Sequence, residues 1–335
     1  MQAADTRDNE RVIRHRQLEL SRRSRFVLGM MRAFVRPMLS SSETPRPKDI
    51  AKRQRQMKSM TWPSLRGHTI VSHSLGEVPC HTWGPLDDSD RPIVLWLHGG
   101  AFILPAAPHF HFSAMAKVCH KLGASGVMPD YRLSPQHRYP AALDDCEAVY
   151  RDLLQRGFSA NKIVLIGDSA GGNLLLGLLQ RLREAQLPYP CCGIPLSPLT
   201  DMARTQNPAR RYLQRIRDPL LPVSSLPHLV DIYCPNQDTS NPEISPLFMD
   251  CRGLPPLFFI ASSSEILVDD AVEMAQRCHA AEVAVKCDIW PHLPHVFPVF
   301  YRILPEAKEA LRDVAIFAKE HLAAKEQLAA NKQRD

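Results

Sequence analysis

A serine between a strand-like run and a helix-like run is the feature that most restricts how this chain can fold. Lys162–Ile166 is a short apolar run typical of a buried strand, and Asn173–Leu182 has the pattern of a helix. Between them stands Gly-Asp-Ser-Ala-Gly-Gly, with Ser169 in the third position. A serine in G-x-S-x-G needs a sharp, strained turn that lifts its hydroxyl out of a sheet, and the small residues Gly167 and Gly171 prevent clashes there. This context predicts that Ser169 is a nucleophile.

A glycine-rich loop upstream of the serine is expected to form an oxyanion hole. The strand candidate Pro92–Leu97 runs into His-Gly-Gly-Ala-Phe, which is similar to the HGGG-type loop that donates backbone N–H groups to a developing oxyanion. The last glycine of that pattern is an alanine here, which is acceptable because the chemistry uses the N–H group. We expect three residues to be the donors: Gly100, Ala101 and Ala170. Five further residues are expected to support the two motifs, without coordinating any metal: His98, Gly99, Gly167, Asp168 and Gly171.

The general base should be a histidine that follows the serine, because the chain order in this kind of site is serine, acid, histidine. The candidates are His228, His279, His292 and His295. The last two lie just beyond the strand candidate Val283–Trp290, where an imidazole on a loop can reach over the edge of a sheet. The residues alone leave His292 and His295 nearly equal.

The acid should stand at the end of the preceding strand, where three carboxylates compete. Leu257–Ala261 is that strand candidate, and Glu265, Asp269 and Asp270 follow it. Asp269 and Asp270 fall where the next helix begins, so they can be explained as charges that favour a helix N-terminus. Glu265 lies on the loop itself, where it can orient the imidazole and stabilise the imidazolium. We therefore favour Glu265, with Asp269 as the alternative.

The remaining pattern alternates strand-like and helix-like runs, which is typical of parallel βαβ units. Further strand candidates are Thr69–Leu75, Val78–Trp83, Gly126–Asp130 and Cys192–Leu196. Helix candidates lie near residues 110–122, 141–156, 170–186, 267–281 and 304–325. Residues 200–247 interrupt the rhythm with many prolines and basic residues. We expect residues 59–199 and 248–335 to form the core, with 200–247 as a second cap segment over the carboxyl edge of the sheet, where such sheets bind ligands.

Positive charge is concentrated at the N-terminus. Residues 1–58 have a net charge of +9, whereas residues 59–335 have a net charge of −3, which argues against a nucleic-acid footprint along the chain. From Phe26 to Met38 apolar doublets recur every four residues among arginines, which predicts a helix packed on the body, with membrane-surface docking as the alternative. Residues 41–58 have the composition of a linker or loop. We assign residues 1–58 to N-terminal cap helices and linker.

The cysteines and the apolar runs bear on the environment of the protein. Nine cysteines occur without a CxxC pair or a Cys/His metal spacing, so neither a disulfide framework nor a zinc site is expected. The first 25 residues contain many arginines rather than the apolar core of a signal peptide. No run reaches the roughly 18 apolar residues of a spanning helix. We expect a cytoplasmic protein without stable membrane insertion.

The chain resembles the hormone-sensitive-lipase-like family of carboxylesterases through most of residues 60–325. Besides the loop at His98 and the turn at Ser169, further stretches match motifs of that family at compatible spacing: Asp130–Pro135, Pro140–Asp145, Ser245–Leu247, Leu254–Pro256, Glu265–Asp270 and Pro294–Phe297. The resemblance implies an α/β-hydrolase fold, with an eight-stranded, mostly parallel sheet flanked by helices and a helical cap. It also selects His295 over His292 and implies the triad Ser169, Glu265 and His295.

The chain departs from that family at two positions. Much of the family has aspartate where this chain has Glu265, although a subset has glutamate. His292 stands where glycine is common before the catalytic histidine. We interpret Asp130, Arg132 and Asp144 as structural groups that form ion pairs or fix loops.

The function expected from this resemblance is hydrolysis of short- to medium-chain carboxylic esters through an acyl-enzyme, with no cofactor. Alternatives are an amide or formamide hydrolase with the same triad, an interfacial lipase, and a non-catalytic ligand receptor on the same fold. The expected partner is a small-molecule ester rather than nucleic acid. For the oligomeric state, the sequence allows a homodimer as well as a monomer.

Overall fold

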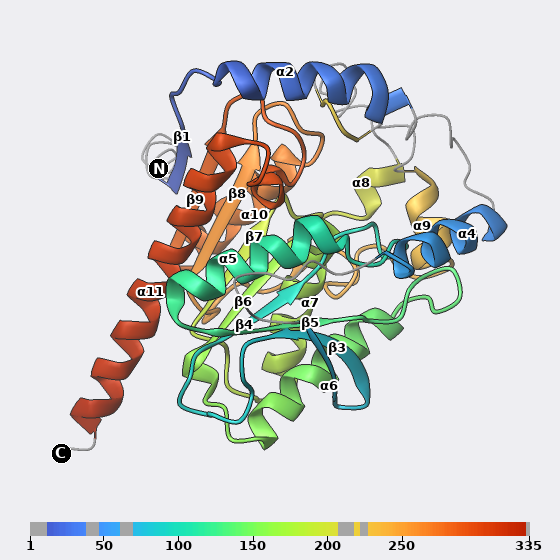
Figure 1. Cartoon of the computed structure of the whole chain (residues 1–335). Coiled ribbons are helices and arrows are strands. Elements are labelled where there is room, and N and C mark those ends of the chain that lie inside the picture. Colours follow the sequence, from blue (N-terminus) through green and yellow to red (C-terminus); the bar gives the residue numbers. More distant parts are fainter. Residues whose placement is uncertain (1–11, 38–46, 61–69, 207–217, 222–226, 333–335) are drawn as a thin grey trace.

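A nine-stranded sheet forms the centre of the protein (Figure 1). The computed structural model describes residues 12–37, 47–60, 70–206, 218–221 and 227–332. Of the two expected cap segments, residues 1–11, 38–46, 207–217 and 222–226 lie outside the described residues. Thr69, the first residue of a strand candidate, also lies outside them. The strands, in their order across the sheet, are β1 (Ile13–His15), β9 (Val285–Trp290), β8 (Leu257–Ser262), β7 (Cys192–Leu196), β6 (Ile163–Asp168), β4 (Ile93–Leu97), β5 (Ser125–Pro129), β3 (Val78–Trp83) and β2 (Val71–Leu75).

The sheet is mostly parallel, and eight of its strands match the strand candidates with ends that differ by two residues or fewer. β3 is antiparallel to both of its neighbours, whereas the pairs from β5 through β4 to β9 are parallel. The expected strand count of eight is wrong, because β1 adds a ninth strand parallel to β9. Arg14 of β1 binds the buried carboxylate of Asp288 on β9. The three residues of β1 are too few to show a strand pattern in the sequence, and they form a strand because they pair with β9.

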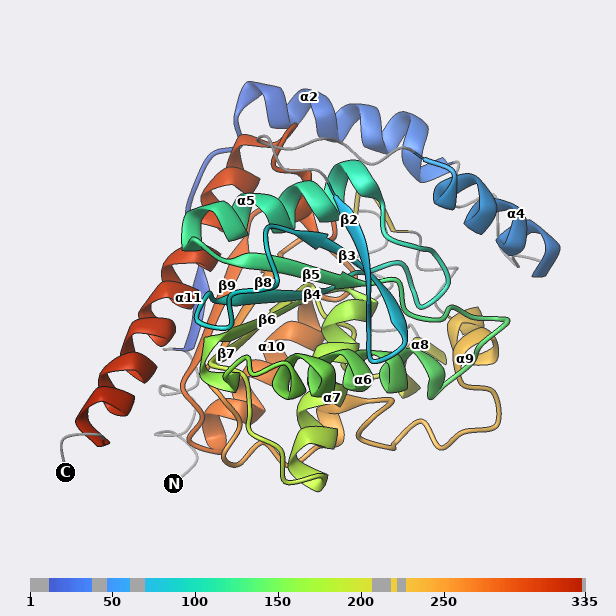
Figure 2. The same ribbon diagram turned by 60° about the horizontal axis from the view of Figure 1, so that its bottom comes forward.

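Helices cover both faces of the sheet (Figure 2). The strands send alternate side chains into two hydrophobic cores: on β4, Ile93 and Leu95 enter one core, and Val94 and Trp96 enter the other. One core contains side chains of α6, α7 and α10, and the other contains side chains of α5 and α11. The helices that pack on the sheet are α5 (Ser113–Leu122), α6 (Ala141–Gln155), α7 (Ala170–Glu184), α10 (Val268–Ala280) and α11 (Pro305–Lys332).

The remaining helical elements are mostly shorter than these helices. They are α2 (Arg22–Met30), η1 (Met31–Val35), α4 (Pro47–Lys58), η2 (Pro108–Phe112), η3 (Ala160–Lys162), α8 (Ala203–Gln206), α9 (Pro227–Tyr233), η6 (Pro246–Phe248) and η7 (Phe297–Phe300). Of these, α2, η1 and α4 lie outside the two layers (Figure 1). The expectation of a linker over residues 41–58 is wrong for its described part, because α4 is helical. Proline at its first position has no N–H group to leave unpaired, and Gln54 donates from its buried amide to the carbonyls of Ile103 and Ser134. Tertiary contacts thus stabilise a helix with little apolar pattern.

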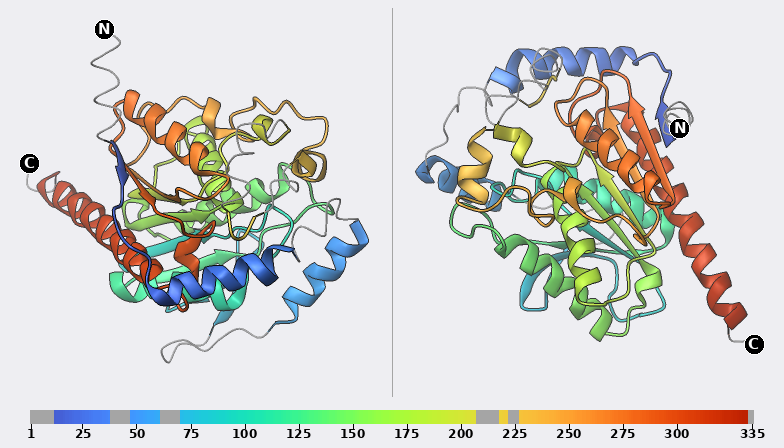
Figure 3. Two further views of the ribbon diagram at one scale, coloured as in Figure 1. Left: turned by 90° about the horizontal axis from the view of Figure 1, so that it is seen from above. Right: turned by 180° about the vertical axis from the view of Figure 1, so that it is seen from behind.

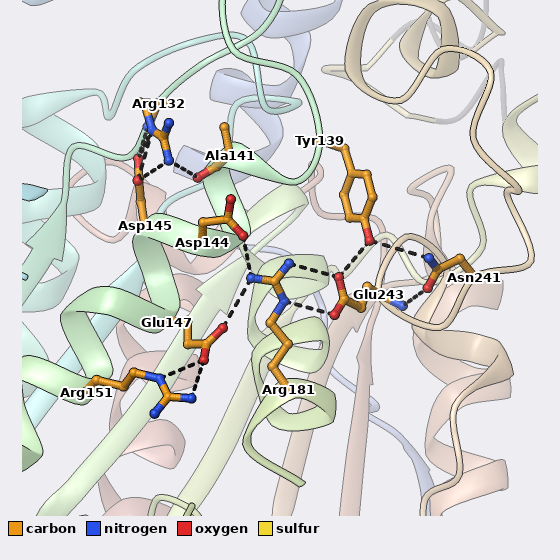
Figure 4. A network of polar contacts seen from close by, with 10 residues as sticks. All are labelled: Arg132, Tyr139, Ala141, Asp144, Asp145, Glu147, Arg151, Arg181, Asn241 and Glu243. Atoms are coloured by element: carbon orange, nitrogen blue, oxygen red, sulfur yellow. Dashed lines mark hydrogen bonds and ion pairs between the residues drawn. The ribbon is translucent and has the colours of Figure 1, made fainter. Parts of the chain in front are cut away.

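A polar network holds the end of the 200–247 segment to the sheet-covering helices (Figure 4). Arg181 of α7 binds both carboxylate oxygens of Glu243 at 2.9 and 3.0 Å, and it also binds Asp144 of α6 at 2.6 Å. Tyr139 donates to Glu243 at 2.7 Å. The guanidinium is well covered, so these charge-assisted bonds are screened less than surface pairs. The network fixes the segment relative to α7, the helix that begins directly after Ser169.

The N-terminal helix α2 packs on the body along one face only. Leu28 and Met31 are buried, as the expectation of a packed helix requires. Phe26, Met30 and Phe34 are instead 70%, 45% and 65% exposed. The prediction was therefore right for one face and wrong for the other. Over the described residues, no helix has both the length and the hydropathy needed to span a bilayer.

Candidate active site

Ser169 occupies a strained turn between the end of β6 and the start of α7. Its backbone has φ +55° and ψ −117°, outside the regions that residues with a side chain usually adopt. The turn is possible because two glycines approach other backbone closely. A Cβ on Gly167 would lie 2.2 Å from the carbonyl oxygen of Gly171, and a Cβ on Gly171 would lie 1.9 Å from that of Leu97. The sharp turn leaves the serine side chain at the carboxyl edge of the sheet.

The structure brings Ser169, His295 and Glu265 into one hydrogen-bonded chain. His295 Nε2 lies 2.9 Å from Ser169 Oγ, and His295 Nδ1 lies 2.8 Å from Glu265 Oε2. The other carboxylate oxygen, Oε1, accepts the backbone N–H of Ser262 at 3.0 Å. Both Glu265 and His295 are buried, at 0% and 3% exposure. A nucleophile, a base and an orienting carboxylate are thus within direct reach of one another.

Electrostatics favour the charged form of His295 despite its burial. Burial alone would lower the pKa of this imidazole, but the hydrogen bond and the negative charge of Glu265 outweigh it and raise the pKa above its ordinary value. An imidazole with a raised pKa is a stronger base toward the serine hydroxyl, and its charged form is stabilised when it takes up a proton. The pair is therefore suited to accept a proton from Ser169.

The competing histidine and carboxylates lie elsewhere. His292 is exposed and has φ +54°, the left-handed conformation that explains why glycine suits this position. Asp270 is buried and accepts the backbone N–H groups of Thr200 and Asp201 at 2.9 and 3.1 Å. Asp269 lies in the first turn of α10. His228 and His279 belong to α9 and α10. Of the residues weighed from the sequence, the structure joins Glu265 and His295 to Ser169.

The glycine-rich loop after β4 presents backbone N–H groups beside the serine. Gly100 has φ +128°, and Ala101 has φ +56°, so the alanine adopts a left-handed conformation that glycine would adopt at lower cost. The N–H group of Gly99 is already used by Asp168, at 2.9 Å. Within the described ranges, no acceptor is bound by the N–H groups of Gly100, Ala101 or Ala170. These three groups remain available to a ligand atom.

Comparisons with known proteins agree with the observed fold. A family model described as the alpha/beta hydrolase fold matches residues 94–299. The chain belongs to this family. An acetyl-hydrolase of Streptomyces hygroscopicus is 33% identical to this hydrolase over 230 residues, which cover 69% of this chain and 76% of that protein. The esterase LipU of Mycobacterium tuberculosis is 36% identical over 240 residues, which cover 70% of this chain and 79% of its own.

A solved structure is similar to this protein over more of the chain than these two relatives. The crystal structure of an esterase from the bacterial hormone-sensitive lipase family superposes on this hydrolase with a TM-score of 0.78 at 29% identity, covering 91% of this chain and 100% of that one. The resemblance read from the motifs is confirmed, and so is the fold of a mostly parallel sheet flanked by helices. The protein is a carboxylic ester hydrolase.

Asp168 holds the glycine-rich loop of this hydrolase against the serine turn. Its carboxylate is fully buried, accepts the indole N–H of Trp96 at 2.9 Å, and lies 3.1 Å from His111 Nε2. The same carboxylate binds the Gly99 N–H group described above. Burial opposes the charge of Asp168, but His111 and Trp96 outweigh it and lower the pKa of the carboxyl. His111 was missed from the sequence, because it reaches Asp168 only through the fold of η2.

Asp168→Asn is expected to lower kcat by roughly 10- to 100-fold, because the asparagine amide turns donors toward Trp96 or Gly99 and displaces the loop that bears the N–H groups. The measurement is kcat and KM on p-nitrophenyl butyrate. Asp130→Asn is the matched control, since Asp130 is partly exposed and pairs with Lys58. If Asp168→Asn raised KM and left kcat unchanged, a role of Asp168 in positioning that loop would be contradicted.

His98 supports the same loop as a neutral ring. Burial lowers the pKa of His98 to about 4, so the ring is uncharged at neutral pH. It stacks on Tyr131 with 4.2 Å between ring centroids, and the Tyr131 hydroxyl donates to the His98 carbonyl at 2.6 Å. Nδ1 lies 2.7 Å from the Gly99 carbonyl oxygen. These contacts help to fix the loop and place His98 outside the chain of Ser169 and His295.

A second buried carboxylate, Asp218, lies near the catalytic acid candidate and was missed from the sequence. It accepts the backbone N–H groups of Ile266, Leu220 and Leu221 at 3.2, 2.8 and 3.0 Å. Burial raises the pKa of Asp218 to about 6, while the positive charge of His295 opposes that rise. Asp218 lies in the proline- and arginine-rich stretch that looked like a cap, where no motif distinguishes it. It ties that stretch to the residue next to Glu265.

Groups of acidic residues, histidines and cysteines that could hold a metal ion are absent from the part of the chain that the structure describes. The nine cysteines are all buried as free thiols. What the site offers chemically is a serine, an imidazole, a carboxylate and unpaired backbone N–H groups.

Proposed function

We propose that this protein hydrolyses short- to medium-chain carboxylic esters through a covalent acyl-enzyme on Ser169. The observation that carries the proposal is the continuous contact from Ser169 Oγ through His295 to Glu265. With Glu265 ionised, Nδ1 of His295 keeps its proton and its N–H donates a hydrogen bond to the carboxylate, which leaves Nε2 free to accept the serine proton. The base is thereby held in the tautomer that the reaction needs.

In the first half of the reaction, Ser169 Oγ bonds to the ester carbonyl carbon while its proton moves to His295 Nε2. The tetrahedral oxyanion is stabilised by the backbone N–H groups of Gly100, Ala101 and Ala170. The bond between the carbonyl carbon and the alkoxy oxygen then breaks, and His295 returns the proton to the leaving alcohol. Water repeats the sequence on the acyl-enzyme and releases the carboxylic acid. Glu265 stays ionised throughout and stabilises the imidazolium.

We assign chain-length preference to a cap made by residues 1–58 and 200–247. Gln54 of α4 binds the carbonyl of Ile103, two residues after Ala101, and Asp218 binds the backbone next to Glu265. Both segments are thus tied to the loops that carry the proposed catalytic groups. A cap held to these loops limits the depth of the acyl pocket and so favours short acyl groups, and one relative is named an acetyl-hydrolase.

A panel of p-nitrophenyl esters from acetate to palmitate tests the proposal. We expect kcat/KM to peak between acetate and octanoate and to fall by at least about tenfold toward palmitate, because even one methylene that the pocket does not accommodate costs about 1–3 kcal/mol. A matched p-nitroanilide series decides between ester and amide hydrolysis. Faster cleavage of the anilides would assign the site to amides instead, and no turnover of either series would favour a ligand-binding role.

A further inference from the structure

An exposed apolar stripe runs along the outer face of α2 and η1. Phe26, Met30 and Phe34 follow one another at intervals of four residues and are 70%, 45% and 65% exposed. These three account for nearly half of the large hydrophobic side chains that are exposed over the described residues, and the other four are spread along the rest of the chain. Isolated exposed apolar residues are ordinary, whereas a contiguous stripe on one helix indicates a surface that binds something.

Positive charge flanks the stripe. Residues 22–36 contain five arginines and no acidic residue. Arg22, Arg25 and Arg32 are exposed, and no described carboxylate forms an ion pair with them. The following helix, α4, adds exposed lysines and an arginine: Lys48, Lys52 and Arg55. Since residues 59–335 are net negative, the net positive charge of the chain comes from residues 1–58. A partner for it should carry negative charge.

The helix cannot turn its stripe inward without losing its attachment to the body. On the opposite face, Glu306 at the start of α11 accepts hydrogen bonds from the Ser21 N–H at 2.7 Å and from the Ser24 hydroxyl. Arg23 donates to the carbonyl of Arg302 at 3.0 Å. Leu28 is 2% exposed. These contacts fix which face points outward, and Figure 3 shows α2 on the outside of the fold.

We propose that the Phe26, Met30 and Phe34 stripe docks this esterase onto an anionic lipid surface, with the flanking arginines contacting the lipid phosphates. A helix with an apolar stripe between basic side chains lies in the plane of a membrane interface, its rings among the upper acyl chains. A second copy of the chain is a poorer occupant, because a symmetric contact would bring the arginines of both copies together. Nucleic acid would leave the stripe unexplained.

The position of the stripe relates docking to the reaction. The inner face of α2 rests on residues 302–306, which follow His295 in the chain after η7. Phe300 of η7 packs edge-on against Phe110 of η2, with 5.1 Å between ring centroids, and η2 also carries His111. Docking through α2 would therefore place the lipid surface on the side of the molecule where α2 packs on residues 302–306, next to η7 and η2, and an ester partitioned into the membrane is concentrated there.

The test is sedimentation of the full-length protein with sucrose-loaded vesicles of phosphatidylcholine, alone or mixed with phosphatidylglycerol. We expect binding to the mixed vesicles that weakens with added salt. The triple variant Phe26→Ser, Met30→Ser, Phe34→Ser should bind at least about tenfold more weakly, because it removes the apolar groups that enter the interface. The variant Arg22→Gln, Arg25→Gln, Arg32→Gln should lose the preference for phosphatidylglycerol.

The matched control is Phe248→Ser with Ile316→Ser, two exposed apolar residues on η6 and α11, which should leave vesicle binding unchanged. Turnover of soluble p-nitrophenyl butyrate checks that each variant is folded. The proposal is overturned if the wild-type protein stays in the supernatant with both vesicle types, or if the stripe variant binds as the wild type does. It is equally overturned if light scattering finds a dimer that the stripe variant converts to monomer, since the stripe would then be an interface between copies.

Discussion

Replacing Ser169 by alanine is expected to lower kcat for p-nitrophenyl butyrate by about 10⁶-fold, as in other hydrolases whose serine is removed from an intact triad. The attacking oxygen is then absent, while His295 and Glu265 keep their contact. Alanine retains the Cβ atom that the turn at φ +55° already accommodates, so the fold should be unaffected. The measurement combines steady-state turnover with the thermal midpoint of both proteins.

Ser113→Ala serves as the control for this prediction. Ser113 is a buried serine on α5 whose hydroxyl has no hydrogen-bond partner among the described residues, so its replacement removes the same hydroxyl group at a position outside the site. We expect full activity from that variant. If Ser169→Ala kept most of its turnover, another group would have to be the nucleophile. The assignment of His295 as the base for Ser169 would then be contradicted as well.

The features that the sequence predicts well are those set by neighbouring residues. β4 is apolar at every position, because Ile93 and Leu95 enter one core while Val94 and Trp96 enter the other, so the strand could be predicted from its continuous apolar run. The turn at Ser169 was predictable for the same reason, because a strand run, a small-residue turn and a helix run are contiguous. Local patterns of this kind define the fold family.

Features that depend on distant contacts could not be read. β1 is a strand because Ile13–His15 pairs with β9, about 270 residues away in the chain, and α4 is held by an amide that bonds to loops after β4 and β5. His111 and Asp218 touch the loops of the site through side chains whose neighbours become known only in three dimensions. Their residue types occur throughout the chain, so no motif marks them.

The choice of acid depends on both kinds of information. The order of strand, loop and helix limits the acid to Glu265, Asp269 or Asp270, and helix N-terminal positions explain the two aspartates. Only the structure shows Asp270 holding the backbone of Thr200 and Asp201 while Glu265 contacts His295. The loop thus accommodates the one methylene by which glutamate is longer than aspartate, and the carboxylate of Glu265 also accepts the Ser262 N–H.

Glu265→Gln should lower kcat by about 10⁴-fold, because the amide fixes the wrong tautomer of His295. The Ser262 N–H donates to Oε1, so the glutamine carbonyl oxygen takes that position and its NH₂ group faces Nδ1. Nδ1 must then accept, the ring proton moves to Nε2, and Nε2 can no longer take the proton of Ser169. The loss of the negative charge that raises the pKa of His295 has a second, independent consequence.

That consequence is a shift of the acid limb in the pH profile of kcat/KM. The reaction needs neutral His295, so activity falls as pH drops through the pKa of this imidazole. Without Glu265 the pKa decreases, and the residual activity of Glu265→Gln should persist to lower pH than that of the wild type. Asp269→Asn is the control and should change neither rate nor profile. If Asp269→Asn lost most of its activity and Glu265→Gln kept its activity, Asp269 would be the acid instead. The variant Glu265→Asp should be faster than Glu265→Gln, since a carboxylate one methylene shorter still selects the productive tautomer of His295.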